Sequence, residues 1–115
     1  VRPDVVAAGD VAAYPSPLGP RRTPLWTSAI EQSKVAAAAL LHGDRAVPYL
    51  PRPYFWTEQF GLSIRVAGQA PVAGEPTEVD GEGDSLLLRW PGVAAAVNYR
   101  IPVPRLRRLG EAVVV

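Results

Sequence analysis

The 115-residue sequence contains no cysteine and no methionine, and it has one histidine. The absence of cysteine excludes disulfides, thiolate metal sites and a redox-active cysteine pair within this chain, and it is compatible with a cytoplasmic protein. A single histidine, His42, offers too few ligands for a metal, so we expect none. The net charge of +1 gives no general reason to expect nucleic acid or a membrane surface as a partner.

Long apolar runs are also missing. The longest, Val35–Leu41, has seven residues, whereas a membrane-spanning helix needs roughly 20. We expect neither a transmembrane segment nor a signal peptide. No G-x-G-x-x-G loop for a dinucleotide occurs either. The hydrophobic content of 48% nevertheless predicts a folded core, and 13 prolines and 10 glycines predict short elements joined by turns.

The first half of the chain predicts a strand, a loop and a helix. Val5–Ala8 is a short strand candidate that ends at Gly9–Asp10, and the proline-rich stretch Tyr14–Arg22 is a loop. Thr23–Pro24 predicts the start of a helix, with Ser28 as an alternative start. Gly43 predicts its end. One face of this helix is apolar and is expected to be buried, and it comprises Trp26, Ile30, Ala37 and Leu41.

The second half predicts a small antiparallel sheet of three to four strands and a terminal helix, Arg105–Gly110. The expected strands are Leu62–Val66, Glu75–Val79, Ser85–Trp90 and Val93–Asn98, with an acidic turn at Asp80–Asp84 and a further turn at Pro91–Gly92. The stretch Asp44–Trp56 is expected to be an extended connector. We therefore predict an α+β fold with a domain boundary between residues 50 and 51.

A strand at Val5–Ala8 needs partner strands. The later motifs favour partner strands in a larger domain, outside this sequence. The sequence VVAAGDVA, followed by LWTSAIEQSKVAAAAL, resembles the closing segment of the FAD-binding domain in the pyridine nucleotide-disulfide oxidoreductase superfamily. Phe55–Gln59 (FWTEQ) and Ile64–Gly68 (IRVAG) resemble the start of the C-terminal domain in FAD-dependent ferredoxin reductases that serve bacterial oxygenases and cytochromes P450. The resemblance covers essentially the whole chain.

The resemblance implies roles for particular residues. Gly9 and Asp10 would contact FAD, the aspartate through the ribityl chain. Trp26, and less clearly Thr27, would place a backbone amide at the pyrimidine edge of the flavin, near the positive end of the helix. Trp56 would lie near the flavin where ferredoxin docks. The arginines of the terminal helix, Arg105, Arg107 and Arg108, would attract an acidic ferredoxin.

Each of these residues also has a simpler interpretation. Asp10 is a common turn residue, Trp26 could be a core residue, Trp56 could join two domains, and the arginines could form a solvated face. Two departures from the family pattern occur, at Pro24, where many relatives have Glu, and at Ser33, where many have Gly.

The implied function is that of an intact flavoprotein that moves electrons from NAD(P)H through FAD to a [2Fe-2S]-type ferredoxin. Residues 1–50 would close its FAD-binding domain and residues 51–115 would form its C-terminal domain. The chain alone would lack the N-terminal FAD- and NAD-binding domains and would therefore be inactive. It could also self-associate through exposed apolar surface. The alternatives are a stand-alone interaction module derived from this fold, or part of a rubredoxin or nitrite reductase type of flavoprotein.

Overall fold

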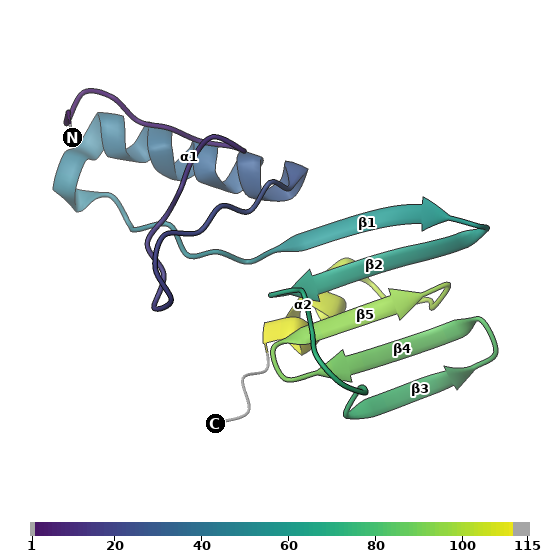
Figure 1. The fold of residues 1–115 in the computed structure, drawn as a ribbon. Helices are drawn as coiled ribbons and strands as arrows, with labels where there is room; N and C mark the ends of the chain where they lie inside the picture. The colour runs from purple at the N-terminus through teal and green to yellow at the C-terminus, as the bar shows by residue number, and fades with distance from the viewer. Residues whose placement is uncertain (1, 112–115) are drawn as a thin grey trace. The chain divides into compact units, whose positions relative to one another are not determined.

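The computed structural model describes residues 2–111. The chain divides into two compact units, Val1–Pro51 and Arg52–Val115. The division lies one residue after the boundary expected from the sequence, and the assignment of the units to flavoprotein domains stays a prediction. The described elements give an α+β fold, which confirms the expected class (Figure 1).

The first unit is organised by helix α1, Trp26–His42, followed by a short 3-10 helix, Gly43–Arg45. The helix ends as predicted at Gly43, which has φ of 56° and donates its backbone N–H to the Ala39 carbonyl. The start lies between the two expected positions, with Leu25 as the N-cap residue. Thr23 is not the N-cap residue, and its hydroxyl shares a 2.6 Å hydrogen bond with the Tyr14 hydroxyl.

The buried face of α1 differs from the expected one. Trp26 and Leu41 are 70% and 76% exposed, whereas Ser28 and Gln32 are 1% and 5% exposed. An alanine-rich helix is apolar on most of its circumference, so the apolar pattern alone did not single out the face that packs within this unit. The buried face of α1 instead carries the polar residues Ser28 and Gln32, which pack against the rest of the first unit.

The predicted strand at Val5–Ala8 is wrong for this structure, since these residues form no strand and Val5 is 61% exposed. A strand requires a second backbone for its hydrogen bonds. Within the described part of the first unit, β-type pairing is limited to an isolated bridge between Tyr14 and Arg21. Val5–Ala8 therefore lacks the strand pairing that its sequence pattern predicted.

The second unit contains five antiparallel strands in the order β1-β2-β5-β4-β3 (Figure 1). Their bounds are β1 Tyr54–Gln59, β2 Leu62–Gly68, β3 Glu78–Glu82, β4 Ser85–Trp90 and β5 Val93–Val97. The strand β4 and the turn at Pro91–Gly92 match the prediction. The sheet exceeds the three to four strands expected because β1 replaces the end of the predicted connector.

Strand β1 is joined to β2 by a two-residue turn of Phe60 and Gly61. Both residues have positive φ, 53° and 75°, which is the geometry of a type I′ hairpin turn. Strand β3 also differs from the prediction, because it lies at Glu78–Glu82 rather than Glu75–Val79. Part of the expected acidic turn is thus in the sheet, and the turn itself is confined to Gly83–Asp84.

Helix α2, Val103–Glu111, covers one face of the sheet and completes the core (Figure 1). Leu106 is fully buried against Ala67 of β2 and against Ala94 and Ala96 of β5. A Cβ atom added to Gly110 would lie 2.5 Å from the Ala67 carbonyl oxygen. The small residues on both sides therefore let the helix lie very close to the sheet.

Arg65 of β2 anchors the segment that leads into α2. Its guanidinium donates hydrogen bonds to the Ile101 carbonyl at 2.8 Å and to the Tyr99 carbonyl at 2.9 Å. These bonds satisfy two backbone acceptors outside the sheet. They fix where the terminal helix begins relative to β2.

Candidate functional site

The Gly9–Asp10 turn lies against helix α1. Gly9 has φ of 85°, and a Cβ atom added there would lie 3.8 Å from the Ala29 Cβ atom. The turn is closed by a hydrogen bond from the Ala12 N–H to the Gly9 carbonyl at 3.0 Å. The Asp10 side chain is exposed. The structure thus brings the predicted cofactor residues Gly9 and Asp10 to the N-terminal half of α1.

The N-terminus of α1 carries two further predicted residues, Trp26 and Thr27. Trp26 is exposed and Thr27 is half-buried. The N-cap residue Leu25 makes no side-chain capping hydrogen bond, and no acidic residue lies in the first turn. The positive end of the helix dipole is therefore not neutralised by a carboxylate of its own first turn. Such an end favours an anionic or oxygen-rich ligand.

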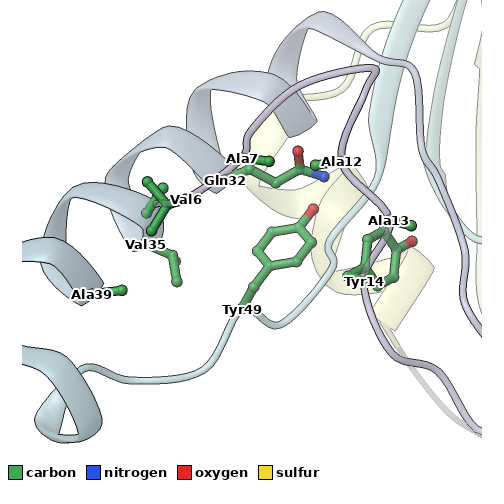
Figure 2. Close-up of a pocket in the computed structure, with 10 residues that line it drawn as sticks. Val6, Ala7, Ala12, Ala13, Tyr14, Gln32, Val35, Ala39 and Tyr49 are labelled. Atoms are coloured by element: carbon green, nitrogen blue, oxygen red, sulfur yellow. The ribbon is translucent and has the colours of Figure 1, made fainter. Parts of the chain in front are cut away.

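A cavity of about 240 Å³ lies in the first unit beside the Gly9–Asp10 turn. Small apolar side chains form most of its wall, and Gln32, Tyr14 and Tyr49 add polar atoms (Figure 2). The Tyr49 and Tyr14 rings meet edge to face with centroids 5.2 Å apart. The sequence interpretation assigned no role to Gln32 or Tyr49. No local signal distinguishes Gln32 from its polar neighbours Glu31, Ser33 and Lys34.

In the second unit, Trp56 and Arg107 meet at the same aromatic ring. The Trp56 ring lies 6.0 Å from the ring of Tyr54, which is 8% exposed. The Arg107 guanidinium lies over the same Tyr54 ring, 5.3 Å from its centroid, in cation–π geometry. Trp56 itself is 51% exposed. The structure therefore joins two predicted site residues that lie 51 positions apart in the sequence.

The three arginines of α2 do not share one environment. Arg105 and Arg108 are exposed, whereas Arg107 is half-buried over Tyr54. Arg52 is hydrogen-bonded to Glu111 at the end of the same helix. Arg105 and Arg108 thus fit a solvated charged surface, and Arg107 also has a packing role.

Among residues 2–111 no group of histidine, cysteine, aspartate or glutamate side chains is arranged to hold a metal ion. In the same part of the chain no helix has the length and apolar character needed to cross a membrane. The described residues offer hydrogen bonding at a glycine-containing turn, a helix N-terminus without an acidic first turn, and exposed arginines on α2.

Comparison with known proteins gives these features a context. No family model matches the chain. It is 33% identical over 88 residues to the 3-phenylpropionate/cinnamic acid dioxygenase ferredoxin–NAD(+) reductase component of Photorhabdus laumondii, covering 75% of this chain and 22% of the relative. It is 36% identical over 99 residues to the probable ferredoxin reductase CtmF of Castellaniella defragrans, covering 84% and 21%. The chain is a homologue of the C-terminal part of ferredoxin reductases.

A solved structure supports the same assignment. The crystal structure of Fdr9 is similar with a TM-score of 0.61 and 29% identity, over 90% of this chain and 28% of that one. The chain spans only about a fifth of the length of the two reductases named above. The predicted resemblance to ferredoxin reductases is thus confirmed, and the roles of Gly9, Asp10, Trp26, Thr27 and Trp56 stay predictions.

Proposed function

We propose that this chain is the C-terminal part of a flavoprotein that passes electrons from NAD(P)H through FAD to a ferredoxin. The observation that carries the proposal is the homology to reductases whose names specify ferredoxin and NAD(+). FAD, when bound, supplies the chemistry that connects a two-electron hydride donor to a one-electron acceptor. The chain by itself is expected to be inactive.

The residues of the first unit fit the edge of a flavin site. Asp10 is an exposed hydrogen-bond acceptor on a turn whose glycine has positive φ. An exposed carboxylate of this kind can accept hydrogen bonds from the ribityl hydroxyls. The N-terminus of α1 at Trp26 and Thr27 lacks an acidic first turn, so its dipole would stabilise negative charge on a nearby ring.

The residues of the second unit fit an electron-acceptor side. Arg105 and Arg108 project from α2 as exposed cations, and exposed cations steer an acidic partner during encounter. Trp56 is half-exposed on β1, and its ring lies beside that of Tyr54 on the same strand. We propose that Trp56 contributes to the surface on which a [2Fe-2S]-type ferredoxin docks, with Arg107 holding Tyr54 beneath it.

The test begins with the complete chain encoded by the gene that contains this sequence. Its intact mass and visible absorption spectrum should show a longer chain with bound flavin, and NADH or NADPH should bleach the flavin bands. Ferredoxin reduction should then follow the addition of a ferredoxin. A natural 115-residue product without flavin absorbance would refute the proposal and would favour a stand-alone interaction module.

The variant Asp10→Ala tests the assigned contact. Loss of a charge-assisted hydrogen bond is expected to weaken FAD binding by about 10–100-fold. The matched control is Asp44→Ala, because Asp44 is also an exposed aspartate of the first unit but lies at the far end of α1, in the 3-10 helix. Equal FAD affinity in both variants would contradict the role of Asp10.

A further inference from the structure

The Gly9–Asp10 turn is tied to helix α1 by a long-range hydrogen bond. The Gly9 N–H donates to the side-chain oxygen of Gln32 at 2.7 Å across 23 positions of sequence. Gln32 is 5% exposed, so this bond is shielded from competing water. The bond acts on the residue next to Asp10, and therefore constrains where the Asp10 side chain begins.

The hydrogen bond also fixes how the Gln32 amide is oriented. A backbone N–H is a donor, so the atom that faces Gly9 is the Gln32 Oε1 atom and the Nε2 group must point elsewhere. Figure 2 shows the Tyr49 hydroxyl directed toward the Gln32 amide. The Gln32 Nε2, Tyr49 hydroxyl and Ser28 Oγ atoms are all buried without a hydrogen-bond partner among the described residues.

These three polar groups influence one another. Burial raises the pKa of Tyr49, and the neighbouring Gln32 and Ser28 side chains act on that pKa in the opposite direction. Ser28 and Tyr49 each carry an oxygen that can accept from the Gln32 Nε2 group. They therefore form a polar support on the side of Gln32 away from Gly9.

A glutamine is a costly residue at this place in the unit. The neighbouring cavity wall includes Val35, Ala36 and Ala39 of the same helix, and an apolar side chain of similar size would bury there without desolvating an amide. What an apolar side chain cannot do is accept the Gly9 N–H. The contact with the turn is thus the feature that distinguishes glutamine from leucine at this position.

We propose that Gln32 is a positioning residue that holds the Gly9–Asp10 turn in the geometry needed for the cofactor contact of Asp10. This inference rests on the proposed function. Gln32 acts through the Gly9 N–H, and Tyr49 and Ser28 orient its amide. It contributes no contact to the cofactor itself.

The hydrogen bond is tested first in the unmodified 115-residue chain. Nuclear magnetic resonance should detect a scalar coupling across the hydrogen bond between the Gly9 nitrogen and the Gln32 side-chain carbonyl carbon. The couplings across the backbone hydrogen bonds of α1 provide the internal standard. Absence of the Gly9 coupling when those of α1 are observed would overturn the proposal without any substitution.

Variants then separate the acceptor from the size of the side chain. Gln32→Leu should increase amide hydrogen exchange at Gly9 by about tenfold or more, because the acceptor is lost. Gln32→Glu keeps an acceptor and should retain the protection at neutral pH. Gln69→Leu is the matched control, since Gln69 is exposed in the second unit. Unchanged Gly9 exchange in Gln32→Leu would refute the positioning role.

The cofactor readout uses the complete protein, from which the flavin is first removed and to which FAD is then titrated back. Gln32→Leu should weaken FAD binding by about tenfold, and Gln32→Glu should restore most of the affinity. Wild-type affinity in a Gln32→Leu protein that has lost the Gly9 protection would overturn the inference. Absence of FAD binding in the unsubstituted protein would instead refute the proposed function, while the Gly9 coupling would still show which residue holds the turn.

Discussion

The substitution Gly110→Ala offers a test in which the structure reverses the sign expected from helix propensity. Alanine in place of a helical glycine normally stabilises a protein by up to about 1 kcal/mol. At Gly110 the added Cβ atom would lie 2.5 Å from the Ala67 carbonyl oxygen and 2.8 Å from the Ala67 carbonyl carbon. Both contacts are with strand backbone, so α2 must move away from β2. Forced contacts of this kind cost about 1–3 kcal/mol.

After subtraction of the propensity gain, the net expectation is a destabilisation of the second unit by up to about 2 kcal/mol. With a urea dependence of about 1 kcal/mol per molar for a unit of this size, the urea midpoint should fall by up to about 2 M. Tryptophan fluorescence in a Trp26→Phe background reports this unit alone, because Trp56 and Trp90 are then the remaining tryptophans. Arg108→Ala in the same helix is the control and should change stability by less than about 0.5 kcal/mol.

A midpoint for Gly110→Ala equal to or above that of the parent chain would refute this reasoning. A double variant with Ala67→Gly gives a finer test. The Ala67 Cβ atom lies 3.1 Å from the added carbon, farther than the carbonyl oxygen. Removing that Cβ should therefore recover only a small part of the lost stability, and full recovery would show that the clash involves the side chain rather than the backbone.

Further predictions concern pH and charge. The pKa of Tyr49 is raised mainly by burial, so its stabilising effect is complete below pH of about 10 and is lost as the pH rises through the folded-state pKa. Tyr49→Phe should reduce the alkaline loss of helical circular dichroism, and a loss equal to that of the parent chain would contradict this prediction. Replacing Arg105 and Arg108 together by Glu should slow ferredoxin association by about tenfold at low salt, with a smaller effect at high salt in stopped-flow measurements. Trp56→Ala should slow ferredoxin reduction more than flavin reduction by NADH, and equal effects on both steps would argue against a role at the acceptor surface.

Local signals account for the elements that the sequence predicted well. The bounds of β4 and the turn at Pro91–Gly92 follow from an apolar run followed by two residues that strongly favour turns. The end of α1 at Gly43 follows from a glycine that takes positive φ. In each case the information lies within a few neighbouring residues, so no knowledge of the rest of the fold is needed.

The elements that the sequence did not predict depend on distant partners. The hairpin of β1 and β2 turns at Phe60–Gly61, and a phenylalanine at positive φ is not a turn signal that a sequence pattern reveals. The stretch Val5–Ala8 has the composition of a strand, yet whether it forms one depends on another backbone being available to pair with it. Pairing of this kind is a property of the whole fold.

The candidate site shows the same division. The motif residues Asp10 and Trp56 could be chosen from the sequence because the resemblance to ferredoxin reductases marks them. The hydrogen bond between Gly9 and Gln32 could not be predicted from the sequence. A helical pattern predicts on which face of the helix a glutamine lies, but it does not predict which backbone group that side chain contacts. Supporting contacts therefore required coordinates, whereas motif positions did not.

The environment of Tyr54 decides which arginines can report on partner binding. Arg107 lies over the Tyr54 ring, and the same tyrosine contacts Trp56. Removing the Arg107 guanidinium would change charge and aromatic packing together, so a slower reaction with ferredoxin could not be assigned to electrostatics. Arg105 and Arg108 are exposed on the same helix and change charge with little effect on packing. A comparison of Arg107→Lys with the double charge reversal at Arg105 and Arg108 therefore separates the two effects. The lysine keeps the charge but stacks less well on the Tyr54 ring. A slower reaction of Arg107→Lys with ferredoxin that does not vary with salt would identify a packing role at Trp56.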